Sequence, residues 1–381
     1  MQFHPYRIIS LTLVKLPLVL CFALGESAFA LEEVVVTAQK RDESMQDVPV
    51  SISAFSEDFI RQAGVDDVDD IISFTPGLTG SSTGTVANWG VRGITSSDFT
   101  IGSEPSVATY IDDGYIGRNV LASSAFFDIE RIEVVRGPQG TLFGRNAAAG
   151  AISVHTNKPN NENSLDIALG GGNEDQRLGE LIGNLAVSET LFIRAGFFKR
   201  ERNTGQTERN SGEDRFDDSE GYRISALWEP TETLSARLTH QRVDFDTRFG
   251  LVHPADIVDA DPHAETIGHD FPHLDKSDTH GTSLHLSWDV SENLTLSSIT
   301  DLRRYDFRFS QDIDGVDFGL LSQADLFLSV DPAPVFGVGY LAEQDQESYS
   351  QEFRLNGSSE SIDWFAGVIW FKEDVRESQA L

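Results

Sequence analysis

The stretch "IERIEVVRGPQGTLFGRNAAAGAISVHTNKP", residues 129–159, contains more information about the fold than any other part of this chain. The Gly-Pro pair at 137–138 predicts a tight turn, because glycine takes positive φ freely and proline fixes φ. Gly144 and Gly150 would let main chain pass close to main chain, and residues 151–156 alternate as a strand does. The pattern predicts a strand, a compact turn-rich segment and a second strand.

The residues before this stretch mix short helices and strands. Residues 66–74 read as a short acidic helix that ends at Pro76-Gly77. Short strands such as "SVATYIDDGYI" (106–116) and "RIEVVRG" (131–137) lie between glycine-rich turns. We therefore expect a compact α+β unit between about residue 31 and residue 160.

The first 30 residues have the pattern of a cleaved export signal. Arg7 supplies a positive start, residues 16–24 are apolar, and Ala28-Phe29-Ala30 is an A-x-A cleavage site. The apolar part is too short for a membrane helix, which needs roughly 20 residues. Because Cys21 is the only cysteine, the exported chain is expected to have no thiol.

Composition excludes some classes of protein. The formal net charge of −32 argues against binding nucleic acid, whose phosphates are also negative. A hydrophobic content of 39% with 25 phenylalanines is enough to form a packed core, so we do not expect disorder.

The second half of the chain alternates with the period of β-strands. In "SLHLSWDV" (283–290), apolar residues occupy every second position, and "YRISALW" (222–228) and "IDWFAGVIW" (362–370) repeat the pattern. Nine strands are predicted, at 164–170, 178–187, 191–200, 221–229, 233–246, 280–290, 293–309, 347–356 and 362–373.

The connections between these strands differ in length in a regular way. Short turns near 188–190, 230–232, 291–292 and 357–361 alternate with long charged segments at 201–220, 247–279 and 310–346, although the connection near 171–177 is also short. Short turns at one end and long loops at the other are typical of an outer-membrane β-barrel. Trp228, Trp288 and Trp364 each lie near a short turn and would form an aromatic belt at one membrane interface.

Five motifs together resemble one family, the TonB-dependent outer-membrane receptors. They are "EEVVVTA" (32–38), "DVPVSISAF" (47–55), "VRGI" (91–94), "YIDDGYIGR" (110–118) and the opening stretch at 129–159. The resemblance implies an α+β plug domain inside an antiparallel transmembrane β-barrel of 22 strands, of which about nine are present here. The chain is then expected to be the N-terminal portion of a longer protein.

This resemblance implies a domain order and an activity. Residues 1–30 would be the signal peptide, 31–41 the TonB box and its tail, 42–160 the plug, and 161–381 the incomplete barrel. The implied activity is energy-coupled import of a scarce nutrient through the cell outer membrane. The default solute is a ferric siderophore; zinc or another metal ion, cobalamin and carbohydrate are alternatives. A structural or adhesive outer-membrane protein is the alternative from a different class.

The resemblance also implies a partner for the valine run near the predicted start of the exported chain. An unpaired β-strand can add to the sheet edge of TonB, the arm of an inner-membrane motor complex. The residues assigned to this TonB box are Glu32, Glu33, Val34, Val35, Val36, Thr37 and Ala38. The alternative is that the run pairs with the protein's own sheet.

A structural or latch role in the plug is assigned to a further set of residues: Arg92, Gly93, Arg131, Glu133, Arg136, Gly137, Pro138 and Gly144. Arg131 and Arg136 resemble plug residues that pair with barrel carboxylates, and an unpaired buried guanidinium would be costly. The alternative is that both are solvated charges at a strand edge.

Two local patterns bear on chemistry. Residues 253–280 hold five of the nine histidines among many carboxylates, so His263, His269 and His273 are candidate zinc ligands, with a solvated loop as the alternative. Gly80-x-Ser82-x-Gly84 matches the hydrolase nucleophile elbow, but the strand before it and the helix after it are missing from the pattern. We therefore expect no enzyme activity and no cofactor.

Overall fold

The computed structural model describes residues 35–37, 40–41, 43–65, 68–83, 86–96, 104–117, 127–173, 175–208, 214–248, 266–267, 274–312 and 339–380. Within these ranges, no helix is both long and apolar enough to cross a membrane. The predicted signal peptide lies outside the described residues.

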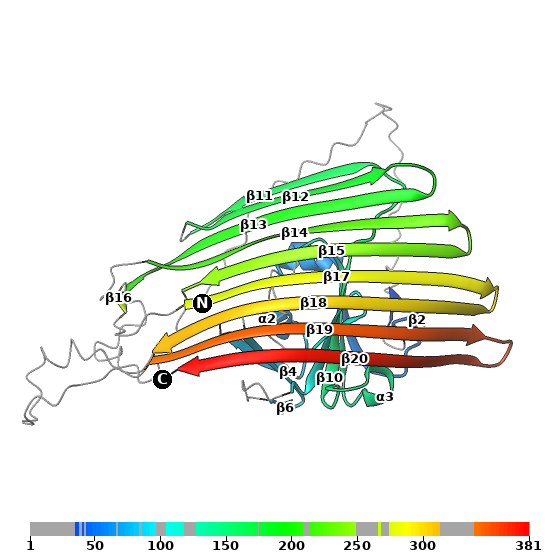
Figure 1. Cartoon of the computed structure of the whole chain (residues 1–381), viewed down its shortest axis with the longest axis horizontal. Helices are drawn as coiled ribbons and strands as arrows, with labels where there is room; N and C mark the ends of the chain where they lie inside the picture. Colours follow the sequence, from blue (N-terminus) through cyan, green and yellow to red (C-terminus); the bar gives the residue numbers. More distant parts are fainter. Residues whose placement is uncertain are drawn as a thin grey trace, which may run out of the picture.

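One large sheet contains the described strands of the second half of the chain, and its long antiparallel strands lie side by side in Figure 1. They follow chain order along a path of nine strands. Their bounds are β11 (Ser164–Gly171), β12 (Arg177–Ala186), β13 (Leu191–Glu208), β14 (Asp214–Thr231), β15 (Leu234–Thr247), β17 (Leu274–Ser291), β18 (Leu294–Asp312), β19 (Gly339–Ser358) and β20 (Asp363–Ala380). The short β16 (Thr266–Ile267) pairs with β13 off this path. We call β11–β20 the barrel sheet.

All nine predicted strands are present, and several extend further than predicted at the end with the long connections. β13 continues to Glu208 rather than 200, and β19 begins at Gly339 rather than 347. In β19 this extension is "GYLAEQDQ", whose last four residues are all polar. Apolar alternation therefore cannot mark these ends, although main-chain pairing continues through them.

The two faces of the barrel sheet differ as the alternation predicts. On one face, large apolar side chains are exposed, and Trp228, Trp288 and Trp364 are each about half exposed. Residues of the opposite face are buried against the smaller N-terminal unit, including Tyr305 and Phe307. The exposed face carries the apolar surface that lipid would cover.

The N-terminal unit, residues 43–157, lies against the inner face of the barrel sheet, and we call it the plug. A five-stranded sheet in the order β3 (Ser51–Ser56), β9 (Ile129–Arg136), β10 (Gly150–Thr156), β7 (Val107–Ile111) and β8 (Gly114–Ile116) forms its centre. Beside it are α1 (Glu57–Ala63), α2 (Val68–Ile72), α3 (Gly140–Phe143) and a second sheet of β4 (Leu78–Thr83), β5 (Val86–Val91) and β6 (Ile94–Thr95).

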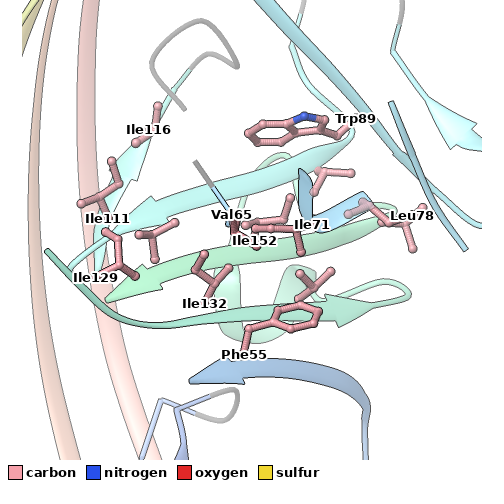
Figure 2. Close-up of a cluster of buried hydrophobic side chains, with 14 of the residues drawn as sticks. Phe55, Val65, Ile71, Leu78, Trp89, Ile111, Ile116, Ile129, Ile132 and Ile152 are labelled. Carbon is pink, nitrogen blue, oxygen red and sulfur yellow. The ribbon is translucent and has the colours of Figure 1, made fainter. Parts of the chain in front are cut away.

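The core of the plug is a cluster of branched aliphatic and aromatic side chains. Figure 2 shows Ile132 and Ile152 from neighbouring strands of the central sheet, with Trp89 and Leu78 from the second sheet around them. Tyr305 and Phe307 of the barrel sheet belong to the same cluster, so the two units share one hydrophobic core. Burial of apolar surface between them favours the docked plug.

The opening stretch folds as its pattern predicts. It forms β9 and β10, which pair antiparallel, with the short α3 in the turn-rich segment between them. Gly144 has φ 78° and ψ −135°, a conformation open only to glycine. A Cβ at Gly150 would collide with the Val135 carbonyl oxygen, which is the predicted close approach of two main chains. The predicted helix at 66–74 is observed as the shorter α2, and α1 was not predicted.

Candidate functional site: the N-terminal segment and the junction between plug and barrel

The described part of the valine run is paired within this chain. β1 (Val35–Val36) lies antiparallel to β2 (Glu43–Ser44), with Val36 opposite Glu43. Val36 is 0% exposed and packs in a plug cluster, whereas Val35 is 47% exposed. The expectation of an unpaired strand is therefore wrong for these two residues in this structure. They pair with Glu43 and Ser44 of the same chain, which was the alternative. Glu32, Glu33, Val34 and Ala38 lie outside the described residues.

Thr37 attaches this run to the central sheet of the plug. Its main-chain N–H donates to both carboxylate oxygens of Glu133, at 2.9 and 3.1 Å, and its hydroxyl donates to Glu133 Oε1 at 3.2 Å. The hydroxyl also lies 3.2 Å from Nε2 of His155. Glu133 is 1% exposed, and Arg131 Nε donates to it at 2.9 Å. We call residues 35–37 and 40–41 the N-terminal segment. Its Thr37 thus supplies hydrogen bonds to a buried carboxylate of the plug.

Burial sets the protonation of this group of side chains. Burial raises the pKa of the Glu133 carboxyl, and the adjacent Arg131 guanidinium opposes that shift. Burial and the same guanidinium lower the pKa of His155 to about 3. His155 is therefore neutral at pH 7, and its contact with the Thr37 hydroxyl is a hydrogen bond between neutral groups.

Lys40 is the second attachment of the N-terminal segment. The side chain is buried, with Nζ 4.5 Å from the centre of the Tyr110 ring, 4.8 Å from that of Phe143 and 3.7 Å from Oδ1 of Asp113. Two aromatic faces and a carboxylate suit an ammonium group. Burial, and then the charge of Arg354, lower the pKa of Lys40, while Asp113 opposes this.

The N-terminal segment also contacts the barrel sheet directly. The side-chain amide of Asn356, on β19, donates to the Lys40 carbonyl at 3.5 Å. Nη1 of Arg41 lies 3.6 Å from Asp363, the first residue of β20, and Arg41 also pairs with Glu43. The N-terminal segment thus contacts both the plug and the barrel sheet.

Two adjacent aspartates form the turn between β7 and β8. Asp112 and Asp113 have φ of 47° and 62°, and Ile111 pairs with Gly114, so this is a two-residue hairpin turn with both central residues left-handed. Aspartate accepts this backbone more readily than most residues. The turn points both carboxylates toward arginines of the barrel sheet.

Each carboxylate of this turn meets a barrel arginine. Nη2 of Arg354 donates to Asp113 at 2.9 Å, and Nη1 of Arg237 lies 3.7 Å from Asp112. Asp112 also accepts from the N–H and hydroxyl of Thr156, at 3.0 and 2.6 Å. Burial would raise the pKa of both carboxyls, but the charges of Arg237 and Arg354 hold the pKa of each below its usual value.

A second junction forms just before β9. Asp128, also left-handed with φ 53°, receives a bidentate contact from Arg194 of β13, at 2.8 Å from Nε and 2.6 Å from Nη2. Nη1 of Arg223, on β14, donates to the Phe127 carbonyl at 2.7 Å and lies over its ring. Arg303, on β18, donates to the Ile111 carbonyl at 3.3 Å.

The two arginines predicted to form a latch have contacts inside the plug. Arg131 pairs with Glu130 and Glu133 of its own strand, and Arg136 donates to the carbonyls of Pro76 and Ile52. The ion pairs of Asp112, Asp113 and Asp128 have the reverse polarity, with carboxylates on the plug and guanidinium groups on the barrel. A latch role for Arg131 and Arg136 stays a prediction.

The other predicted plug residues form turns. Arg92 and Gly93, with φ of 54° and 81°, make the tight turn between β5 and β6. Gly137 has φ 105°, and its N–H donates to the Ala149 carbonyl at 2.9 Å. Pro138 follows directly and lies exposed in the turn.

Sequence reasoning did not single out Asp112, Asp113 or Asp128, or the barrel arginines that meet them. A usable signal was present in the pattern. Arg223 and Arg237 lie at positions of their strands that alternate with the apolar outward residues. An arginine on the inner face of a barrel strand needs a buried partner, and the plug is the nearest source of one.

The predicted metal ligands His263, His269 and His273 lie outside the described residues. Among the residues that are described, no group of three His, Cys, Asp or Glu side chains is placed to hold a metal ion. The zinc hypothesis therefore stays a prediction. Gly80 and Ser82 lie in β4, and the next element is the strand β5, so the helix that a nucleophile elbow requires does not follow.

Comparisons with known proteins give one consistent result. The family model of the TonB-dependent Receptor Plug Domain matches residues 44–151. The Ferripyoverdine receptor of Pseudomonas aeruginosa is 30% identical over 161 residues, which are 42% of this chain and 19% of that protein. The Vitamin B12 transporter BtuB of Vibrio vulnificus (strain YJ016) is 33% identical over 150 residues, 38% of this chain and 24% of that protein.

A solved structure extends the likeness beyond the plug. The ferric yersiniabactin uptake receptor FyuA from Yersinia pestis superposes with a TM-score of 0.72 at 17% identity, covering 87% of this chain and 49% of that one. At this identity the likeness concerns the fold, and it includes the barrel sheet. The chain spans about half the length of this solved structure, and the matched parts are about a fifth to a quarter of the two curated relatives.

Proposed function

This chain belongs to the TonB-dependent receptors, proteins of the outer membrane, and we propose that it takes part in energy-coupled import of a scarce nutrient. The observation that carries the proposal is a plug joined to the inner face of a barrel sheet, with a β-branched N-terminal segment attached to that plug. A passive pore has no use for a plug that fills the space inside its barrel.

Energy for import has to come from elsewhere, because the outer membrane has no supply of ATP. We propose that residues 32–38 are the TonB box, which pairs as an extra strand with TonB of the inner-membrane motor complex. With the predicted domain bounds, residues 42–160, which include the plug, would then close the barrel, and residues 161–381 would form barrel wall in contact with outer-membrane lipid. A pull on the box would rearrange the plug and open a path for solute.

The first candidate for the solute is a ferric siderophore complex. The relatives named above include a ferripyoverdine receptor and a ferric yersiniabactin uptake receptor, and this supports the choice. Cobalamin is the second candidate, since a vitamin B12 transporter is 33% identical over 150 residues. Zinc capture by His263, His269 and His273 is a third proposal and rests on composition alone.

Deletion of Glu32 to Ala38 tests the transport proposal in cells that produce the full-length protein. Uptake of the solute should be lost while the amount of protein in the outer membrane stays the same. Unchanged uptake would contradict TonB coupling and favour the structural or adhesive alternative. A rise of the protein in the outer membrane under iron limitation, and not under zinc or carbon limitation, would support the ferric siderophore.

A further inference from the structure

Three arginines lie on the inner face of the barrel sheet, on the neighbouring strands β13, β14 and β15 (Figure 1). They are Arg194, Arg223 and Arg237, and none is more than 8% exposed. Ser225 pairs with Arg194 and is two residues from Arg223. Leu227, two residues further along β14, pairs with Arg237. The three guanidinium groups therefore belong to neighbouring levels of one wall, and we call them the arginine patch.

Within the described strand segments that carry the arginine patch, the wall contains no acidic residue. These segments are residues 192–198, 221–227 and 237–243. The side chains between the arginines are neutral and polar. The hydroxyl oxygens of Ser225 and Thr239 are 2.9 Å apart, and the amide oxygen of Gln241 accepts from Arg223 Nε at 3.1 Å. Hydroxyl and amide groups can also donate to an anion, so nothing on this wall opposes a negative ligand.

In the docked state the plug supplies the anions that the wall lacks. Arg194 contacts both carboxylate oxygens of Asp128, at 2.8 and 2.6 Å. Arg237 Nη1 lies 3.7 Å from Asp112 Oδ1, and Arg223 Nη1 donates to a plug carbonyl oxygen at 2.7 Å. These oxygens all belong to the plug and move with it. Because a buried guanidinium that loses its partner is costly, the wall favours a replacement anion when the plug moves away.

We propose that the arginine patch binds the carboxylate groups of the solute, which take the places of Asp112 and Asp128 when the plug rearranges. Arg194 holds Asp128 by two parallel contacts, the geometry that guanidinium groups form with carboxylates. The ligand class is therefore a solute with two or more ionised carboxylates. This inference rests on the proposed function, because a solute reaches this wall only when the plug gives way.

The patch would also make solute passage selective. A solute with several carboxylates restores the ion pairs that departure of the plug removes. A neutral or cationic solute leaves the guanidinium groups without counter-charges and so meets an unfavourable wall. Among the solutes considered above, an acidic ferric siderophore fits the patch better than a free metal cation.

Citrate block of the full-length protein in a planar lipid bilayer tests the patch without TonB. Urea should unfold the plug and open the pore, because the barrel strands keep their paired main-chain groups in lipid. Citrate, with three carboxylates, is the probe, and acetate, with one, is the comparison. Citrate should reduce the potassium chloride current at a concentration about tenfold lower than acetate, because several contacts act together. Equal half-blocking concentrations would overturn the requirement for several carboxylates.

Removal of the three charges tests the residues themselves. The combined substitutions Arg194→Gln, Arg223→Gln and Arg237→Gln should raise the half-blocking concentration of citrate about tenfold, because charge-assisted hydrogen bonds become neutral ones. An unchanged concentration would overturn the proposal. The control is Lys199→Gln, which removes a positive charge from the outer face of β13 and should leave the block unchanged.

A second variant separates charge from damage to the wall. Lysine at the same three positions keeps the charges and should hold the half-blocking concentration within about threefold of the unchanged protein. A tenfold rise in the lysine variant would overturn the assignment of the effect to charge. Uptake after deletion of residues 32–38 is measured independently. Uptake that survives the deletion would refute the transport proposal, whereas lost uptake with an unchanged citrate block in the glutamine variant would overturn the arginine patch alone.

Discussion

The carboxylate of Asp113, in a hairpin turn of the plug, lies 2.9 Å from Nη2 of Arg354 on the barrel wall, although the two residues are 241 positions apart. Arg354 also contacts both carboxylate oxygens of Glu352, and Asp113 also faces Lys40. A single turn of the plug therefore joins the N-terminal segment to the barrel. Changes at this turn should affect both.

Asp113→Asn should weaken the docking of the plug by roughly 2–3 kcal/mol. This is less than the cost of leaving a buried charge without any partner, because Arg354 still pairs with Glu352. Asparagine accepts the left-handed backbone, so the turn itself should survive. The measurement is the urea midpoint of plug unfolding, followed by the fluorescence of Trp89, which is fully buried in the plug. Asp175→Asn is the matched control, because Asp175 is also left-handed and lies exposed. Equal midpoints for the two variants would contradict the assignment.

His155 should make the plug less stable in acid. Its pKa is about 3 in the folded protein, against an ordinary value of 6.5, so the unfolded chain binds the extra proton between these values. Stability is therefore complete above pH 6.5 and falls as the pH drops toward 3, with a loss of about 2 kcal/mol by pH 5.

Comparison of His155→Gln with the unchanged protein isolates this effect. Glu133 acts in the opposite direction, because its raised pKa favours the folded state at lower pH. The variant should lose less stability between pH 7 and pH 5 than the unchanged protein, as judged by the urea midpoint. A variant with the same pH dependence would show that His155 is not the responsible group.

Gly150→Ala should destabilise the plug by about 1–3 kcal/mol, the usual cost of forcing extra atoms into a packed site. The new Cβ would meet the Val135 carbonyl oxygen across the β9–β10 pair, where main chain cannot easily move aside. Gly140→Ala is the control, because no atom lies within 4 Å of the corresponding Cβ position. The urea midpoint should fall for Gly150→Ala alone, and a fall of equal size in the control would refute the explanation.

The parts of the fold that sequence predicted well are those whose signal is local. Alternation marked all nine barrel strands, because apolar residues that point to one face alternate with mixed residues that point to the other. The polar strand ends escaped detection, since neither face there is apolar. β1 was read as unpaired because its partner, Glu43-Ser44, is two polar residues with no strand pattern of its own.

The junction could not be predicted in the same way. Asp112 and Asp113 lie inside the segment 106–116 that was predicted as one strand, whereas the structure has a turn there between β7 and β8. Asp128 was not singled out, and the arginines that meet these aspartates lie 66 to 241 positions further along the chain. Charge alone did not reveal which side of the junction would be positive. The sequence motif pointed to Arg131 and Arg136 as the residues that contact the barrel. In the structure the aspartates of the plug turns make those contacts instead.

Asp128 and Arg194 provide the clearest test of this polarity, since their contact is bidentate and buried. Asp128→Asn and Arg194→Gln should each lower the stability of plug docking by about 3 kcal/mol, because each leaves one buried charge without its partner. The double variant should lose less than the sum, with a coupling energy of about 2 kcal/mol. The control cycle pairs Asp128→Asn with Lys199→Gln, at an exposed lysine on the outer face of the same strand β13, and should show no coupling. Additive losses in the Asp128 and Arg194 cycle would mean that the plug is held by packing rather than by these ion pairs.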